Sequence, residues 1–460
     1  MKKTSFALIG VAALAGVTLA GCGSSGSTSS ASTNGKVVLT VATVNNSQMV
    51  QMEQLTKTVF EKENPNIVVK FDTLPENQLR PKITEDVATN AGQFDLVTIG
   101  NYETPIWAKN GWISDLTPML NSMSASQKKS YQFNDLIKPV MDSLQYNHNT
   151  YAIPFYAESS MIMYNKRIFA KDHLTMPLHP TWSQIATLAK EANNPSQGVY
   201  GIVLRGASGW GMNLAPIDTV LNTFGGGWFN MHWKPTLTSS ADEKAVSFYV
   251  NLLKKYGESS AATTGWQTSL SLMAHGKAAM YYDATSEAGV LETPSQSTIA
   301  GNVGFAYAPV DVTSNGSHWL WSWALAVVKD SPHPHAAFKF LTWATSLQYL
   351  KLAGKTFGWA NVPPGTRYSI YQDPQYLKAA PFASITLKSI NTATPDAPTN
   401  HPVPYTGVQF VEIPQFETLG DEVSQDISSA IAGNTTVKQA LATGQQQAAQ
   451  LVNAQNTKGY

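Results

Sequence analysis

The sequence predicts an α/β protein made of two lobes, and two observations support that prediction. First, 460 residues exceed what one compact core usually holds, which favours two or more domains. Second, strand-like and helix-like segments alternate from Lys36 onward, which is the order of β-α-β units with a largely parallel sheet. The sequence shows no long internal repeat. We therefore expect one ligand-binding unit built of two α/β lobes.

The N-terminus has the composition of an export signal followed by a tether. Two lysines precede the apolar stretch 6–20, which is too short to span a bilayer as a stable helix. The next residues resemble a bacterial lipobox, in which the cysteine is lipidated, and Cys22 is the only cysteine of the sequence. A single cysteine allows no intrachain disulfide. We expect a lipoprotein signal peptide at 1–21, lipidation of Cys22 and a Gly/Ser-rich tether at 22–35.

Apolar patterns place the main elements along the rest of the chain. Residues 37–43 are β-branched and apolar, and a helical pattern then runs to Asn64, where Pro65 follows. Residues 67–71 predict a second strand, and 94–99 is a short apolar run typical of a strand buried on both faces. Local signals further along predict helices after Ser183 and Pro332, strands at 303–309 and 325–328, and helices at 419–431 and from 437.

Composition favours a neutral ligand. The sequence has 31 basic and 31 acidic side chains, so it has no net charge to attract nucleic acid or an anionic membrane surface. Aromatic residues make up 10% of the chain, including 12 tryptophans, whereas charged residues make up only 13%. Such a composition suits a soluble protein with an aromatic-rich pocket, although many of these rings are expected in the core.

Three segments carry a resemblance to a known family. They are 94–97 with 107–113, 151–154 with 163–166, and 276–280. In their order and spacing they resemble the extracellular solute-binding proteins of ABC sugar importers, the maltose-binding-like family. The C-terminal third, at 358–367, 381–383 and 402–410, together with 44–46 and 319–326, is similar to the sorbitol/mannitol-binding (polyol-binding) proteins within that family.

The resemblance implies a two-lobed periplasmic-binding-protein fold of type II. Each lobe would be a mainly parallel sheet flanked by helices, with the ligand cleft at the hinge. Matching segments imply one lobe at 36–152 and 303–345 and the other at 153–302 and 346–460. The implied protein is extracytoplasmic, anchored to the membrane through Cys22, monomeric and not an enzyme. It would close around a neutral sugar alcohol or small sugar and deliver it to ABC permease subunits.

Loops that follow strands are the first places to look for ligand contacts, because ligands of open α/β sheets lie beyond the carboxyl ends of the strands. Asn45, Asn46 and Gln48 follow the first strand, and Tyr102 and Glu103 follow the run 94–99. Amides and carboxylates bind hydroxyl groups, while aromatic rings pack on C–H faces. The alternative for the asparagines is a helix cap or a turn.

Resemblance and local pattern add further candidates. Tyr156 and Glu158 fall where maltose-binding relatives place a carboxylate on sugar hydroxyls; the alternative for Glu158 is an ion pair with Lys166 or Arg167. A glycine-rich loop after a strand offers a bidentate donor beside a stacking ring, and a carboxylate follows the strand-like run 279–282. Three tryptophans and one more arginine lie in the polyol-type segments. These further candidates are Arg205, Trp210, Asp283, Trp321, Trp323, Trp359 and Arg367.

Two other classes of protein were weighed. An exported glycoside hydrolase would use Glu103 and Glu158, or Asp283, as paired carboxylates. A metal site is suggested by His333 and His335, but they flank a proline at a predicted helix start, without a nearby cysteine or carboxylate cluster. We therefore expect no catalytic residue, no metal and no cofactor, and no nucleic-acid partner.

Overall fold

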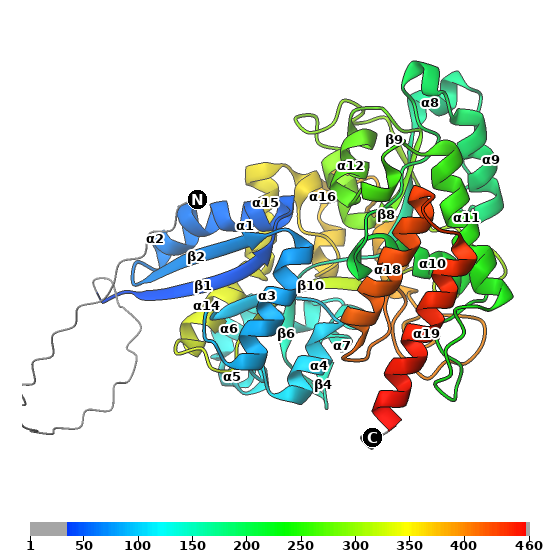
Figure 1. Ribbon diagram of the computed structural model, residues 1–460. Helices are drawn as coiled ribbons and strands as arrows, with labels where there is room; N and C mark the ends of the chain where they lie inside the picture. The colour runs from blue at the N-terminus through cyan, green and yellow to red at the C-terminus, as the bar shows by residue number, and fades with distance from the viewer. Residues whose placement is uncertain (1–34, 457–460) are drawn as a thin grey trace, which may run out of the picture.

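The computed structural model describes residues 35–456 of the chain (Figure 1). The predicted signal peptide, Cys22 and nearly all of the predicted tether lie outside the described residues. Within the described part, none of the helices is both long and apolar enough to cross a membrane.

The first lobe is organised around a five-stranded sheet with the order β2-β1-β3-β10-β6. Strands β1, β2 and β3 pair in parallel, whereas β10 runs antiparallel to both β3 and β6. Every residue of β3, β6 and β10 is buried, which explains why these strands are continuous apolar or small-residue runs. The strands are β1 (Val37–Val44), β2 (Ile67–Leu74), β3 (Leu96–Ile99), β6 (Ala152–Glu158) and β10 (Trp321–Val327).

Short helices cover this sheet, and local capping fixes where several begin. The Asn46 side chain accepts from the backbone N–H of Met49 and so caps α1, as the alternative reading of this asparagine predicted. The elements are α1 (Ser47–Leu55), η1 (Thr56–Phe60), α2 (Glu61–Glu63), α3 (Glu76–Thr89), α4 (Glu103–Asn110), α5 (Thr117–Ser122), α6 (Ala125–Tyr131), η2 (Phe133–Asp135), α7 (Lys138–Asp142), β4 (Gln145–Tyr146), β5 (Asn149–Thr150), α14 (Pro334–Ala344) and α15 (Leu347–Phe357).

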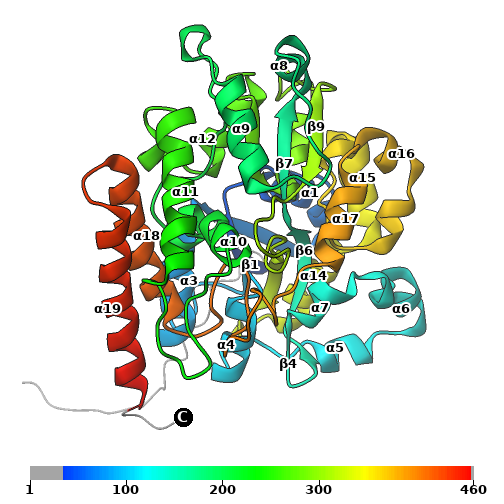
Figure 2. The same ribbon diagram turned by 90° about the vertical axis from the view of Figure 1, so that its right-hand side faces the viewer.

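The second lobe has a three-stranded sheet with the order β8-β7-β9, formed by β7 (Ser160–Asn165), β8 (Met280–Ala284) and β9 (Val303–Tyr307). Both neighbours of β7 run antiparallel to it. The prediction of a mainly parallel sheet in each lobe is therefore wrong for this lobe, where parallel pairing is limited to bridges such as Val203 to Tyr281. Strand β7 continues directly from β6 of the first sheet, and β8 and β9 both run opposite to it (Figure 2).

The remaining elements pack around the second sheet and the cleft. Helices α18 and α19 lie along α11 at one side of the molecule (Figure 1). The elements of this group are α8 (Lys166–Lys171), α9 (Trp182–Ala192), η3 (Pro195–Gln197), η4 (Trp210–Leu214), α10 (Ala215–Thr223), α11 (Ser240–Tyr256), η5 (Ala261–Thr263), α12 (Trp266–Ala274), η6 (Thr285–Glu287), α13 (Ala288–Leu291), η7 (Trp359–Asn361), η8 (Tyr368–Gln372), α16 (Pro374–Ala379), α17 (Ala383–Asn391), α18 (Phe416–Ala432) and α19 (Val437–Asn456).

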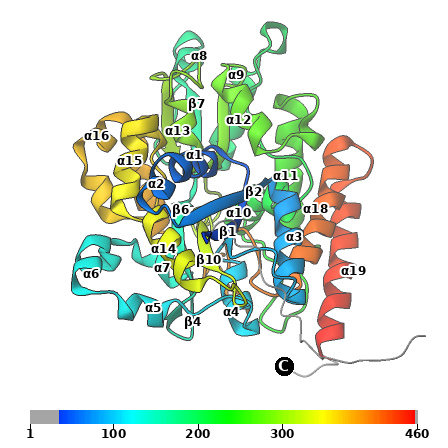
Figure 3. The same cartoon turned by 90° about the vertical axis from the view of Figure 1, so that its left-hand side faces the viewer.

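Strand pairing moves the points where the chain crosses between the lobes. All of β6 belongs to the first sheet, so the first crossing lies at Ser159 rather than at 152/153. Strand β9 pairs with β7 in the second sheet, so the return crossing lies between β9 and β10 rather than at 302/303. Helix α15, assigned to the second lobe from the sequence, packs on α1 and α14 of the first (Figure 3). The expected boundaries therefore need these three corrections.

Candidate ligand-binding site

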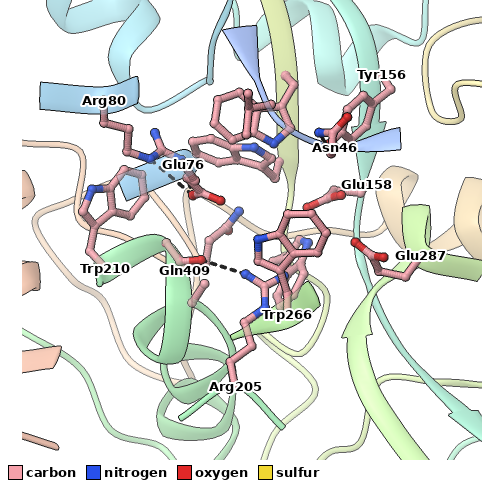
Figure 4. Close-up of a pocket in the computed structure, with 16 residues that line it drawn as sticks. Asn46, Glu76, Arg80, Tyr156, Glu158, Arg205, Trp210, Trp266, Glu287 and Gln409 are labelled. Carbon is pink, nitrogen blue, oxygen red and sulfur yellow. Dashed lines mark hydrogen bonds and ion pairs between the residues drawn. The ribbon is translucent and has the colours of Figure 1, made fainter. Parts of the chain in front are cut away.

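A cavity lies between the two lobes, with about 530 Å³ of space free of protein atoms within it and at its mouth (Figure 4). Its walls come from the ends of β1, β6 and β10 and the start of α3 on one side. On the other side they come from the loop and η4 after Leu204 and from the segments around Trp266 and Glu287. The lining residues are Val44, Asn46, Glu76, Arg80, Tyr156, Glu158, Arg205, Trp210, Gly211, Ala215, Trp266, Glu287, Trp319, Trp321, Trp323 and Gln409.

Arg80 is held by carboxylates and by ring faces. Its guanidinium donates to Glu76 one helical turn earlier (2.8 Å from Nη2) and to Glu103 at the start of α4. Glu103 in turn accepts from the backbone N–H of Gly100 (2.8 Å). The guanidinium carbon lies 4.2, 4.9 and 4.8 Å from the ring centroids of Trp210, Trp321 and Trp323. Arg80 is thus fixed by ion pairs and by cation–π contacts with both lobes.

Arg205 is fixed on the opposite wall. Its Nε lies 2.9 and 3.1 Å from the two carboxylate oxygens of Asp283, Nη2 also donates to Asp283, and Nη1 donates to the Gly211 carbonyl at 2.7 Å. The guanidinium also lies 5.7 Å from the ring centroid of Trp319. Because Asp283 is fully buried and paired, it supports Arg205 rather than lining the cavity. The pair gives a donor array of fixed orientation.

Glu158 ends β6 and projects into the cavity, where it accepts a hydrogen bond from the Ser286 hydroxyl. The alternative ion pair with Lys166 or Arg167 is absent from the described residues, because Arg167 donates instead to the Thr298 carbonyl. Burial raises the pKa of Glu158 from 4.5 to about 8, with the negative charges of Asp283 and Glu76 adding to it and Ser286 and Arg205 opposing it.

Glu287 faces the same part of the cavity as Glu158 (Figure 4). Burial raises its pKa well above the usual range, and the neighbouring charges of Asp283 and Glu158 raise it further. The structure gives the Glu287 carboxyl no ion pair with any described residue. Two carboxyls that favour their protonated forms therefore share one end of the cavity.

Amide and phenol groups add neutral hydrogen-bonding groups. Asn46 Nδ2 donates to the Tyr156 hydroxyl at 3.0 Å. Gln409 Nε2 donates to the Leu320 carbonyl at 2.9 Å, whereas its Oε1 is buried without a partner among the described residues. An unpaired buried oxygen beside the cavity is available to accept from a bound hydroxyl.

Five indole rings line the cavity, and several of them touch. Trp210 from the second lobe packs edge-on against Trp321 of the first, with ring centroids 5.7 Å apart, and Trp321 packs in the same way against Trp323 at 5.4 Å. The buried indole N–H groups of Trp210 and Trp319 have no partner among the described residues. The rings supply flat apolar faces together with unused donors. This combination suits a ligand with C–H faces and many hydroxyl groups.

Most of the predicted site residues come together here. Asn46, Tyr156, Glu158, Arg205, Trp210, Trp321 and Trp323 line the cavity. The predicted residues Tyr102, Glu103 and Asp283 contact lining residues from behind; for example, the Tyr102 ring packs on Trp210 with centroids 5.0 Å apart. Gln48 Nε2 lies 3.5 Å from the carbonyl of Ser286, whose hydroxyl donates to Glu158.

Three predicted residues lie away from the cavity, so their assignment to it is corrected. Asn45 is exposed at the end of β1. Trp359 packs against Gly354 of α15, where a side chain on the glycine would clash with the indole. Arg367 is fully buried and donates to the backbone carbonyls of three residues instead of facing the cavity; these are Tyr131, Gln132 and Thr345.

Several lining residues were not predicted. Glu76 lies two residues after the end of β2. The apolar pattern predicts that this strand ends at residue 71, so the search for ligand contacts just after the strand did not reach Glu76. Arg80 lies one helical turn further on. Glu287 lies four residues after the predicted Asp283, while Gln409 and Trp319 lie inside the segments similar to polyol-binding proteins. Trp266, at the start of α12, belongs to none of the sequence patterns or family-like segments that predicted ligand contacts.

Two α/β lobes enclosing an aromatic and polar cavity define a bilobed binding protein. Residues 45–350 match the family model of bacterial extracellular solute-binding proteins, and the chain belongs to that family. It is 44% identical to the mannitol-binding protein of Pseudomonas aeruginosa, over 90% of this chain and 93% of that protein. It is 26% identical to the erythritol/L-threitol-binding protein of Mycolicibacterium smegmatis, over 62% of each chain.

Solved structures agree with this family. An ABC transporter solute-binding protein from Agrobacterium vitis S4 with bound D-mannitol is 47% identical, with a TM-score of 0.88, and the match covers 91% of this chain and 98% of that one. Another from Agrobacterium radiobacter K84, in complex with ribitol, shares the fold at 24% identity, with a TM-score of 0.79 over 90% and 98% of the two chains.

The comparisons confirm the predicted fold, the solute-binding class and the extracytoplasmic setting. They place the chain among binding proteins rather than enzymes. The carboxylates proposed for a hydrolase also have other partners, since Glu103 binds Arg80 and Asp283 binds Arg205. In the described part of the chain, no cluster of three or more His, Cys, Asp or Glu side chains is arranged to hold a metal ion.

Proposed function

We propose that this chain binds a mannitol-like sugar alcohol in the cavity between its lobes and delivers it, unchanged, to the permease of an ABC importer. The observation that carries the proposal is the make-up of the cavity. Five indole rings, two arginines, two carboxyls without an ion-pair partner among the described residues and an unpaired amide oxygen of Gln409 line one small cavity. The identity to a mannitol-binding protein over nearly the whole chain supports the same ligand class.

In this proposal the hydroxyl groups and the carbon chain of the polyol are bound by different kinds of side chain. The guanidinium groups of Arg80 and Arg205 donate to hydroxyl oxygens, and hydrogen bonds to charged groups contribute about 1.5–3 kcal/mol each. Glu158, Asn46 and Gln409 offer acceptors for hydroxyl protons. The indole faces pack on the carbon chain, which has no flat ring and so fits among edge-packed indoles.

Closure would couple binding to delivery. Trp210 of the second lobe already packs on Arg80 and Tyr102 of the first, and Asn77 Nδ2 lies 3.3 Å from the Ser208 carbonyl across the cleft. Gly211 lies against Glu76 so closely that a Cβ atom would overlap the carboxylate. A ligand that contacts both walls stabilises this closed arrangement by its difference in affinity for the closed and open forms. The permease would recognise the closed form.

Isothermal titration calorimetry of the protein against D-mannitol, sorbitol, arabitol and ribitol tests the proposal, with maltose and trehalose as controls. We expect a hexitol to bind with one-to-one stoichiometry, to raise the melting temperature and to be recovered unchanged. Preferential binding of the disaccharides, or release of product from a panel of glycosides, would contradict it.

We further propose that lipid on Cys22 holds the mature protein at the membrane, as a monomer beside its permease. The observation behind this proposal is the lipobox-like sequence before the only cysteine. Mass spectrometry of the mature N-terminus should find a diacylglyceryl cysteine. Replacement of Cys22 by alanine should move the protein from the membrane fraction to the soluble fraction, and an unchanged distribution would rule out the anchor.

A further inference from the structure

One end of the cavity holds two carboxyl groups without a cation beside them. Glu158 accepts from the Ser286 hydroxyl, and Glu287 makes no ion pair with a described residue. The positive charges of both cavity arginines are already paired with carboxylates other than Glu158 and Glu287. Arg80 is paired with Glu76 and Glu103, and Arg205 with Asp283.

Charge is therefore unbalanced in and around the cavity. The carboxyl groups are those of Glu76, Glu103, Glu158, Asp283 and Glu287, whereas the guanidinium groups are only those of Arg80 and Arg205. With a neutral polyol bound, Glu158 and Glu287 have no cation beside them, and their raised pKa values keep them largely protonated. A ligand with one positive charge would favour ionisation of one of these carboxyls, and between buried groups such an attraction is screened less than on the surface.

The walls near this end are also suited to a cation. The indoles of Trp266 and Trp319 line the same cavity, and the guanidinium of Arg205 already lies 5.7 Å from the Trp319 ring centroid. The faces of indole rings attract ammonium groups through the ring quadrupole. Carboxyl groups beside indole faces provide the two kinds of contact that an alkylammonium uses.

We propose that the cavity also binds amino-polyols, in which an amine that is protonated at neutral pH replaces one terminal hydroxyl, with the ammonium group held between Glu158 and Glu287. The inference rests on the proposed function, because the remaining hydroxyls would use the same contacts as a neutral polyol. It also predicts the opposite result for sugar acids. A ligand carboxylate at this end would have no cation beside it, because both arginines are paired with other carboxylates, and it would bind poorly.

Proton release distinguishes this binding mode from ordinary polyol binding. Burial raises the pKa of Glu158 to about 8 and that of Glu287 well above its usual range, so both are largely protonated near pH 7. An adjacent ammonium favours their ionised forms, and the released protons pass to the buffer. The other charged or titratable groups that face this pair are Glu76, Tyr156, Arg205 and Asp283.

Calorimetry with three matched ligands tests the inference: 1-amino-1-deoxy-D-mannitol, D-mannitol and D-mannonate. Each titration is run at pH 7 in phosphate and in Tris, whose ionisation enthalpies differ. We expect the amino-polyol to bind in competition with mannitol, to release protons that mannitol does not release, and to bind far more tightly than mannonate. Equal enthalpies in both buffers for the amino-polyol would overturn the inference.

Glu287→Gln provides a second measurement, because glutamine keeps the size of the side chain but cannot ionise. We expect it to raise the ratio of the amino-polyol and mannitol dissociation constants by about tenfold or more and to lower the proton release. Glu422→Gln, at an exposed position of α18, is the matched control and should change neither quantity. An unchanged ratio in Glu287→Gln refutes the inference.

The outcomes also separate the inference from the proposed function. If mannitol binds and the amino-polyol binds about a hundredfold more weakly or not at all, the inference fails and the proposed function stands. If the amino-polyol binds but no neutral polyol does, the inference stands and the proposed ligand class is wrong. If no polyol of either kind binds, both fail.

Discussion

Arg205 and Arg367 are both buried arginines that the sequence placed in the ligand site, and the structure gives them different partners. Arg205 lines the cavity and is paired with the carboxylate of Asp283. Arg367 lies outside it and donates to backbone carbonyls of α6 and the end of α14, including two bonds to Thr345 at 2.9 and 3.0 Å. Its Nη1 lies 3.6 Å from Asp135.

The comparison shows that the acceptors of a buried arginine decide whether it mainly stabilises the fold or mainly binds a ligand. Backbone carbonyls from separate segments make an arginine a connector, because each of its bonds ties down another part of the chain. Arg205 is bound by one carboxylate and one backbone carbonyl, which leaves some of its guanidinium N–H groups free for a ligand. Arg367 should therefore matter for stability, and Arg205 for affinity.

The largest effect we expect is on stability, from Arg367→Met. The substitution leaves two buried carbonyl groups, those of Tyr131 and Thr345, without this donor, and each buried unpaired group costs about 1–3 kcal/mol. The free energy of unfolding should fall by about 3–5 kcal/mol, measured by urea denaturation. The affinity of the protein that remains folded for mannitol should stay within about threefold of the original. A large loss of affinity without a loss of stability would reverse the comparison.

Arg205→Lys should act mainly on ligand binding. A lysine keeps the charge but cannot bond to Asp283 through two nitrogens and to the Gly211 carbonyl at once. We expect the dissociation constant for mannitol to rise by about tenfold or more, measured by calorimetry. Arg367→Lys is the matched control. It should lower the melting temperature and leave the dissociation constant for mannitol nearly unchanged.

The pH dependence of the free energy of unfolding tests Glu158, which lies in the cavity wall like Arg205. A carboxyl whose pKa is raised by folding stabilises the fold fully below its unfolded value and loses that contribution as the pH rises through its folded value. For Glu158 this window runs from 4.5 to about 8. The unfolding free energy of the empty protein should fall with rising pH in this window, by up to about 1.4 kcal/mol per pH unit from this group.

Glu158→Gln should flatten that slope, measured by denaturation at several pH values. Other buried carboxyls with raised pKa values, including Asp242 and Glu417 at about 7, keep their own slopes in both proteins. The difference between the two curves therefore reports Glu158. Parallel curves would show that this carboxyl does not titrate between the two values.

The smallest effect should come from Trp359→Phe. Its indole packs on α15 away from the cavity, and phenylalanine keeps most of the apolar contact. Stability should change by less than about 1.5 kcal/mol, and affinity for mannitol should not change. Trp323→Phe, which alters a ring over Arg80, should weaken binding where Trp359→Phe does not.

Local sequence rules located those site residues that lie directly after a strand. Arg205 follows the buried run at 202–204, so the strand-end rule reached it, whereas Glu158, the last residue of β6, was predicted from the resemblance to maltose-binding relatives. The same rule missed Glu76 only because β2 runs three residues further than its apolar pattern, where the strand becomes partly exposed. The fold class followed from alternation of strands and helices, but the direction of β7 depends on its continuity with β6 and was not visible in the pattern.

Long-range contacts explain the remaining errors. Nothing near Arg367 in sequence indicates that its acceptors lie at Tyr131 and Gln132, more than two hundred residues earlier. Trp359 was grouped with the cavity because its segment is similar to polyol-binding relatives, and such a similarity does not separate ligand contacts from packing contacts. Lobe boundaries failed for a related reason, since pairing between strands decides which sheet a segment joins.

The direct run of β6 into β7 has a mechanical consequence. Glu158 is the last residue of one sheet, and Ser160 begins the other. A rotation of the lobes that bends the chain at Ser159 would have its pivot beside Glu158, so this carboxyl would move little. Trp210, at the start of η4, would move with the second lobe. A solute bound first beside the nearly stationary Glu158 would then be enclosed by the moving indole.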